Sequence, residues 1–312
     1  MITLPQSILA IDIAKQQLDV STWPQRQRRQ YRNDPAGIDD LLALACQRQA
    51  TVIFEATSIY DRKLIAALDR AGLPYHRANP LKARQFAGAA GFLAKTDRVD
   101  SDMLASYGAR VPLPLTEPVP AERQAVRRLA DRRDQLVAMR KAELTRRQQI
   151  DDVEIVAEVD SLLAELGRRI ADYEARIDAA MKHHRLAPLK DWLVSTPGIG
   201  PLTSAALVAS LPELGNRSSK TIAALVGLAP LARDSGKLRG RRAIRGGRAR
   251  IRSLLFLAAR HAIKHPAFKP FADRLLTAGK PRKVVLVAVA RKLLIVLNTM
   301  LKEQRPFRTV HA

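Results

Sequence analysis

Two acidic residues stand at the ends of apolar runs, where a protein could use them for metal-dependent phosphate chemistry. Asp12 lies near the end of SILAIDIA (7–14), and Glu55 closes TVIFEA (51–56) in the same manner. A charge in such a run costs free energy unless something compensates it. If the two runs are neighbouring parallel strands, both carboxylates lie at one sheet edge, where hard cations such as Mg²⁺ would find oxygen ligands.

A second acidic group lies in KTDRVDSDML (95–104). Asp97 and Asp100 are three residues apart, so at the start of a helix they share one face, with Cβ atoms roughly 5–6 Å apart, whereas Asp102 points elsewhere. Acids also favour helix N-termini because of the helix dipole, and that alone accounts for this pair. A two-metal phosphoryl-transfer site needs several carboxylates around cations about 3.5–4 Å apart, so these acids are its candidates.

The segment RDSGKLRGRRAIRGGRARIR (233–252) carries nine Lys or Arg residues and one acid, which is +8 and over a third of the chain's net charge of +23. Its four glycines argue against a continuous helix. A solvated basic loop is the ordinary explanation, but this density of unbalanced charge favours a track for phosphates. The candidate contacts, taken as a group, are Lys237, Arg239, Arg241, Arg242, Arg245 and Arg248.

Ser235 begins the Ser-Gly pair in this segment and is a candidate nucleophile. No His lies beside it as a base, and Ser-Gly is common in loops. A serine hydroxyl that attacks phosphate needs strong electrostatic support, which Arg and Mg²⁺ would supply.

The segment TPGIG (196–200) predicts a helix, a tight glycine turn and a second helix, as in a helix-hairpin-helix. Gly198 and Gly200 permit close backbone approach, and the N–H groups of the following helix can hold a phosphate without reading sequence. A plain helical turn is the alternative.

Strands and helices must position these residues. The pattern of the first hundred residues predicts them in the order β-β-β-α-β-α-β-α. Asn33-Asp34-Pro35 supplies a turn, an N-cap and a Pro at the first helical position. A later helix over about 60–71 ends at Gly72. The predicted strands are 7–14, 18–23, about 29–33, 51–56 and 73–78.

The rest of the chain is predicted to be helical. Four prolines between Pro112 and Pro120 form a stiff spacer. Beyond it, 122–150 and 162–181 predict an antiparallel helical hairpin, either a solvated pair or a dimerising coiled coil. We therefore expect α/β followed by all-α, with domains at 1–115, 116–190 and 191–312.

The amino-acid composition indicates which class of molecule the protein binds. The chain has 312 residues, of which 47% are hydrophobic and 27% charged, as in a globular protein. The charge excess predicts a polyanionic partner, with nucleic acid favoured over a membrane surface. The best candidate for a membrane span, 284–290, runs into Arg291-Lys292, and no secretory signal is visible. A single cysteine, Cys46, excludes a disulfide framework, so we expect a cytoplasmic, nucleoid-associated protein.

The motifs AIDIAKQQLDV, FEATSIY, ANP-x-x-x-[RK] and KTDRVDSDMLA, in this order, closely resemble the DEDD transposases of bacterial insertion sequences, including the pilin-inversion recombinases. The resemblance implies a ribonuclease-H-like (RuvC-like) N-terminal domain similar to Holliday-junction resolvases. It assigns four metal-binding, catalytic acids to Asp12, Glu55, Asp97 and Asp100, with two Mg²⁺ ions. Ser58 departs from the glycine expected in many relatives.

The segment GLAP-x-x-x-DSG-x-x-RG and the later GK-x-x-KV-x-x-x-x-x-RKLL (279–294) resemble the C-terminal transposase domain of the same family. There the matching serine, Ser235, links covalently to DNA as a 5′-phosphoserine and expels a 3′-hydroxyl. The implied protein is a site-specific recombinase that moves its own element between donor and target DNA as a dimer or tetramer.

Some family members use an element-encoded guide RNA, and the charge excess leaves room for one. Two other functions stay open from the residues alone. One is a Mg²⁺-dependent, structure-selective DNA nuclease that uses water as nucleophile, and the other is a non-catalytic DNA-binding protein.

Overall fold

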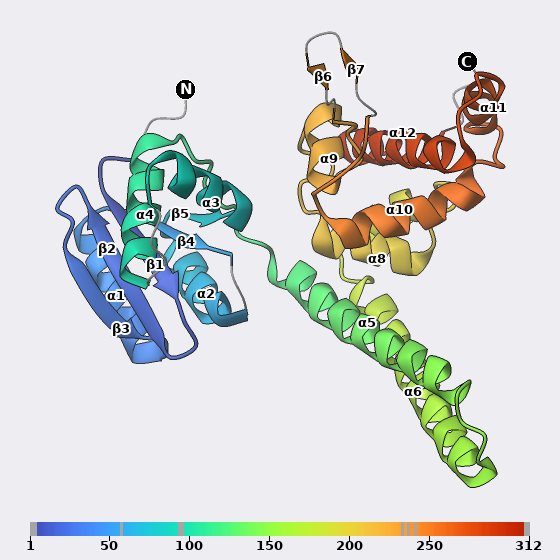
Figure 1. The fold of residues 1–312 in the computed structure, drawn as a ribbon, viewed down its shortest axis with the longest axis horizontal. Coiled ribbons are helices and arrows are strands. Elements are labelled where there is room, and N and C mark those ends of the chain that lie inside the picture. The colour runs from blue at the N-terminus through green and yellow to red at the C-terminus, as the bar shows by residue number, and fades with distance from the viewer. Residues whose placement is uncertain are drawn as a thin grey trace. The chain divides into compact units, whose positions relative to one another are not determined.

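The computed structural model describes residues 5–56, 59–92, 97–231, 234–235, 238–239 and 242–308; the side chains of 97–99, 234–235 and 238–239 are outside this description. The chain divides into two compact units, Met1–Pro118 and Val119–Ala312 (Figure 1). Each unit has its own buried core. The three-domain division expected from the sequence stays a prediction.

The N-terminal unit is built on a five-stranded sheet of order β3-β2-β1-β4-β5. β1 pairs antiparallel with β2 and β2 antiparallel with β3, whereas β1, β4 and β5 run parallel. The strands are β1 (Ile8–Ile13), β2 (Gln17–Trp23), β3 (Arg28–Arg32), β4 (Thr51–Glu55) and β5 (Tyr75–Ala78).

Capping residues set the ends of the helices in this unit. The Asp34 carboxylate accepts a hydrogen bond of 2.9 Å from the Gly37 amide, and Pro35 occupies the first turn, as predicted. A Gly at the C-cap with φ 65° ends α2, where a left-handed residue closes the helix. The helical elements are α1 (Pro35–Gln47), the 3₁₀ turn η1 (Ile59–Asp61), α2 (Arg62–Ala71), α3 (Pro80–Ala89) and α4 (Asp97–Arg110).

The sheet buries both faces because successive side chains alternate between them. Leu9 and Ile11 of β1 pack in one apolar cluster with residues of α1 and α2. Ile8 and Ala10 pack in another with residues of α3 and α4. The resulting layers of helix, sheet and helix (Figure 1) form a mixed α/β architecture compatible with a ribonuclease-H-like domain.

The C-terminal unit is almost entirely helical in its described part, with one short hairpin, β6 (Asp234–Ser235) and β7 (Leu238–Arg239), whose strands are antiparallel. Its helices are α5 (Ala121–Arg147), α6 (Val153–Ala180), α7 (Ala187–Val194), α8 (Pro201–Ser210), α9 (Ser219–Val226), α10 (Ala249–Ala262), α11 (Lys269–Thr277) and α12 (Arg282–Lys302). α5 and α6 form the predicted antiparallel pair. Arg133 reaches Glu174 at 2.9 Å and Arg147 reaches Asp160 at 2.8 Å, so residues farther along α5 meet residues nearer the start of α6.

α12 is long and apolar enough to cross a membrane by length and composition alone. Its apolar face, including Val289, Leu293 and Leu297, is fully buried in the core of the C-terminal unit. The helix therefore has the character of a core helix of a folded domain.

Candidate functional site

Asp12 and Glu55 lie side by side on neighbouring parallel strands. In the pairing of β1 with β4, Ile11 is level with Phe54, so the next residues along each strand are these two acids. Both are half-buried. The adjacency expected for two parallel strands that end in carboxylates is therefore present.

Both acids belong to the sheet face that α4 covers. Ala10, two residues before Asp12, and Ile53, two residues before Glu55, are buried in the cluster shared with α4. Because alternate residues of a strand share a face, the two carboxylates follow Ala10 and Ile53 on that side.

Gly108 gives the position of the C-terminal half of α4 on this face. A Cβ added at Gly108 would lie 2.0 Å from Cδ1 of Ile53 and 3.2 Å from Cδ1 of Ile8. The helix therefore lies very close to the sheet where β1 begins, and a side chain at this position would displace it.

Asp102 shows the direction in which the helix runs. It contacts Ser21 of β2, which pairs with Ala10 of β1, and Ala10 pairs on its other side with Ile53, the residue nearest Gly108. Asp102 and Gly108 therefore lie at the same level along β1, and α4 crosses the sheet from β2 toward β4 between them. Asp97 and Asp100 occupy its first turns, and the Asp100 side chain is half-buried.

The four acids were predicted to bind metal, and carboxylate oxygens are the donors that Mg²⁺ prefers. Among the residues whose side chains are described, no three His, Cys, Asp or Glu residues form a group that could hold a metal ion. The Asp97 side chain lies outside that set. The complete quartet stays a prediction.

Asp102 fixes α4 to the sheet, a role that the sequence did not indicate. The buried Ser21 hydroxyl donates to its Oδ1 at 2.6 Å, and Arg28 Nε donates to its Oδ2 at 3.1 Å. Burial raises the pKa of the Asp102 carboxyl, but the hydrogen bonds from Arg28 and Ser21 lower it by more, so this pKa lies below its ordinary value. The one sequence signal was a serine between Val20 and Thr22 in β2.

Asp19 is a further carboxylate near Asp12. The two residues are directly opposite each other in the β1–β2 pairing and therefore share a face. The Asp19 carboxylate accepts hydrogen bonds from Gln17 at 2.7 Å and from Gln30 at 3.0 Å. It offers a matched control for any test of Asp12.

Ser235 lies in the C-terminal unit, in the β6–β7 hairpin, where it pairs with Leu238 (Figure 1). The side chains of Ser235 and Arg239, and the residues Lys237 and Arg241, lie outside the described part of the chain. Their proposed roles stay predictions.

The basic residues that follow divide into two groups. Arg248 forms a two-armed ion pair with Glu213 at 2.5 and 2.6 Å. Burial raises the pKa of Glu213, but the hydrogen bond from Arg248, a backbone hydrogen bond and the charges of Arg248 and Arg217 together lower it by more, so this pKa lies below its ordinary value. Arg242 and Arg245 are exposed and make no ion pair with any described acid. Arg248 therefore has a structural partner, whereas Arg242 and Arg245 face solvent.

Gly198 and Gly200 join α7 to α8 in a helix–turn–helix arrangement and have different surroundings. Gly198 has φ 86°, and a Cβ there would lie 2.4 Å from the backbone oxygen of Ala258 in α10. Gly200 caps α8 just before Pro201, and a Cβ there would meet open space. Close packing against α10 explains why residue 198 is a glycine. The backbone at Gly200 has open space beside it, so a ligand could approach it closely.

Two family models match this chain. One, described as a transposase and of the DEDD type of the IS110 group, matches residues 9–151. The other, described as the transposase IS116/IS110/IS902 family, matches residues 190–273. They cover the segments that contain the four acids and Ser235.

The chain is also similar along its length to curated proteins. It is 27% identical to a pilin gene-inverting protein of Moraxella bovis, over 97% of this chain and 98% of that protein. The pilin gene-inverting protein of Moraxella lacunata is 27% identical over the same shares. An uncharacterized 42 kDa protein of insertion element IS900 from Mycobacterium paratuberculosis is 30% identical over 48% of this chain and 38% of that protein.

Proposed function

This chain belongs to the DEDD transposases of the IS110/IS116 group and is a DNA recombinase; from that premise we propose that it cuts and rejoins DNA at the ends of its own mobile element. The observation that supports the proposal most is the adjacency of Asp12 and Glu55 at the ends of β1 and β4. The two further acids belong to the first turns of α4, which packs on the same face of the sheet.

We assign the binding of divalent cations to Asp12, Glu55, Asp97 and Asp100. Bound Mg²⁺ would neutralise and polarise the scissile phosphate. The chain's own contribution is to hold the four carboxylates in place. The strand pairing holds the first two, and the packing of α4 against the sheet holds the others.

We assign the nucleophile to Ser235. Its hydroxyl oxygen bonds to phosphorus as the bond from phosphorus to the 3′-oxygen breaks. The serine hydroxyl loses one proton in this step, and the departing 3′-oxygen gains one. The product is a 5′-phosphoserine and a free 3′-hydroxyl. The phosphoserine conserves the phosphodiester, so the reverse attack rejoins exchanged strands without ATP.

DNA binding is assigned to the exposed arginines beside the hairpin and to the turn before α8. Arg242 and Arg245 can neutralise phosphates without losing an ion pair to a described acid. The open backbone at Gly200 and the N-terminus of α8 suit a helix-hairpin-helix contact with a phosphate. Neither contact reads sequence, and an element-encoded RNA, as used by some family members, would supply the choice of site.

A homo-oligomer is supported by the far end of the α5–α6 pair. Large apolar side chains are exposed there, among them Val153 at 81% and Ile155 at 48%. Burying them against a second copy would remove apolar surface from water. As a DNA-acting enzyme the protein is expected to be soluble and cytoplasmic.

The test is a strand-exchange assay with purified protein and element ends taken from the DNA that flanks the gene. Asp12→Asn should reduce product at least 100-fold with unchanged DNA binding, whereas Asp19→Asn, on the same sheet face, should remain within threefold. Full activity of Asp12→Asn would contradict the assignment. Products that are cut and never rejoined would favour the structure-selective nuclease.

A further inference from the structure

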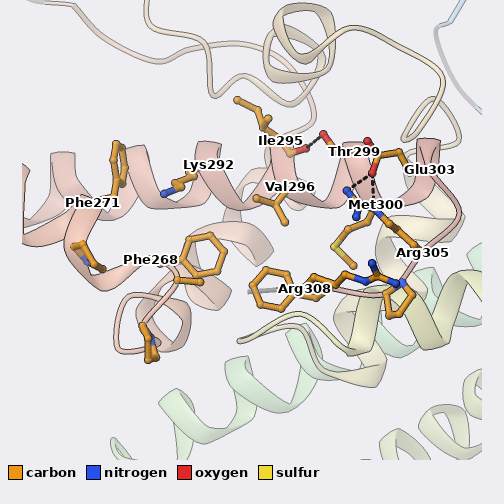
Figure 2. Close-up of a pocket in the computed structure, with 15 residues that line it drawn as sticks. Phe268, Phe271, Lys292, Ile295, Val296, Thr299, Met300, Glu303, Arg305 and Arg308 are labelled. Atoms are coloured by element: carbon orange, nitrogen blue, oxygen red, sulfur yellow. Dashed lines mark hydrogen bonds and ion pairs between the residues drawn. The ribbon is translucent and has the colours of Figure 1, made fainter. Parts of the chain in front are cut away.

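The C-terminal unit contains a cavity that the recombination chemistry does not use. It has a volume of about 570 Å³ and lies between α11, α12 and the segment 304–308 that follows α12 (Figure 2). This volume is within the range of roughly 300–1,000 Å³ typical of small-ligand sites.

Aromatic rings form one part of its wall. Phe307 stacks on Phe268 with ring centroids 6.1 Å apart and planes 15° from parallel. Phe268 is buried, whereas Phe271 and Phe307 are partly exposed and so offer surface to a ligand. Flat apolar faces of this kind are what a nucleobase stacks on.

Cations form another part of the wall. Figure 2 shows Lys292 projecting from α12 beside Phe268 and Phe271, and its Nζ lies 4.9 Å from the Phe271 ring centroid. Arg305 is paired with Glu303, the one acid in the lining. Lys292 and Arg308 have no acidic partner among the described side chains, so the cavity keeps a positive excess that suits a phosphate.

The wall supplied by residues 304–308 is held in place by the rest of the unit. The Phe307 amide donates a hydrogen bond of 2.8 Å to the Ser195 hydroxyl, and that hydroxyl donates to the Trp192 carbonyl at 2.6 Å. The His265 ring meets Phe307 edge-on at 5.9 Å. Contacts with the rest of the C-terminal unit therefore hold the Phe307 ring in its position in the cavity wall.

We propose that this cavity binds one unpaired nucleotide of a nucleic acid strand, with the base against Phe271 and Phe307 and the phosphate near Lys292 and Arg308. A paired base is stacked inside its duplex and does not present its faces, so the cavity selects single-stranded or extruded nucleotides. The proposal rests on the proposed function in that a recombinase opens and exchanges strands.

The test is fluorescence anisotropy of the full chain with a labelled 12-nucleotide single strand and with the duplex of the same sequence. Phe271→Leu and Lys292→Gln should each weaken single-strand binding at least fivefold and change duplex binding less than twofold. Lys283→Gln, an exposed lysine on the same helix outside the lining, is the matched control and should change neither. Circular dichroism melting confirms that each variant is folded.

Equal losses on single strand and duplex, or no loss on either, would overturn the proposal. Should Phe271→Leu fail to fold, Lys292→Gln decides alone. A DNA and an RNA version of the oligonucleotide distinguish the sources of the nucleotide, and selective loss on either supports the site. Binding is measured in a Ser235→Ala background, so a failure of the strand-transfer chemistry leaves this outcome unaffected.

Discussion

Replacing Asp102 by Ala removes the carboxylate that joins α4 to β2 and β3. The Ser21 hydroxyl, which is 1% exposed, loses its acceptor. Arg28 loses its ion pair, but its side chain is 53% exposed and water replaces much of that interaction. The stability effect therefore comes mainly from the serine.

A hydrogen bond to a charged acceptor contributes about 1.5–3 kcal/mol, and a buried hydroxyl without a partner costs about 1–3 kcal/mol. The Asp102 side chain is 28% exposed, which places the expected loss near the lower part of these ranges, at about 2 kcal/mol. In a Ser21→Ala background no hydroxyl is left unpaired, so the same substitution should cost less than about 1 kcal/mol.

The assay is urea unfolding followed by tryptophan fluorescence. The chain has two tryptophans, Trp23 in the N-terminal unit and Trp192 in the C-terminal unit. A Trp192→Phe background makes Trp23, which packs against the α4 cluster, the only reporter. Asp40→Ala, an exposed acid on α1, is the control and should change stability by less than about 0.5 kcal/mol.

Strand exchange is then measured where more than nine-tenths of each variant is folded. Asp102→Ala should lower the rate at least tenfold, because α4 carries Asp97 and Asp100 and loses its fixed position. A stability loss that is equal with and without Ser21, or a folded variant with full activity, would refute this role for Asp102.

Three further outcomes are expected. Gly198→Ala should lower the free energy of unfolding by about 2–3 kcal/mol because a side chain would clash with a backbone oxygen at positive φ, whereas Gly200→Ala should melt normally and bind DNA more weakly. Arg248→Gln should lower the melting temperature, while Arg245→Gln should leave it unchanged and reduce the magnitude of the slope of log affinity against log salt by about 1, from about −5 for six phosphates. Burial lowers the pKa of His76 in the folded state below its ordinary value of 6.5, so its contribution to the free energy of unfolding is complete above pH 6.5 and is lost as pH falls below that value. His76→Asn should reduce the change in the free energy of unfolding between pH 5 and 8, measured by urea unfolding. An unchanged pH dependence would contradict this role of His76.

Much of the secondary structure of the N-terminal unit could be predicted from the sequence because it depends on local chemistry. The Asp34-Pro35 cap, the stop of α2 at Gly72 and the apolar run of β1 each depend on neighbours within a few positions. The adjacency of Asp12 and Glu55 needed one further assumption, that the two buried strands are neighbours and run parallel, and the pairing of β1 with β4 meets it.

Long-range pairing explains what the sequence left out. Asp102 is 81 residues from Ser21, and Glu213 is 35 residues from Arg248, so no local pattern marks either pair. Arg248 therefore looked like any other arginine of the basic segment. The cavity beside Phe307 depends in the same way on Phe307 packing against Phe268, 39 residues earlier in the chain.

The covalent bond between Ser235 and DNA tests the central claim most directly. Element-end DNA is incubated with protein and Mg²⁺, denatured in detergent, digested and analysed by mass spectrometry. We expect a nucleotide on Ser235 in the wild-type chain, with none in Ser235→Ala or Glu55→Gln and an unchanged yield in Ser253→Ala, an exposed serine on α10. Free 5′-phosphate ends, formed at the same rate without the Ser235 hydroxyl, would contradict it.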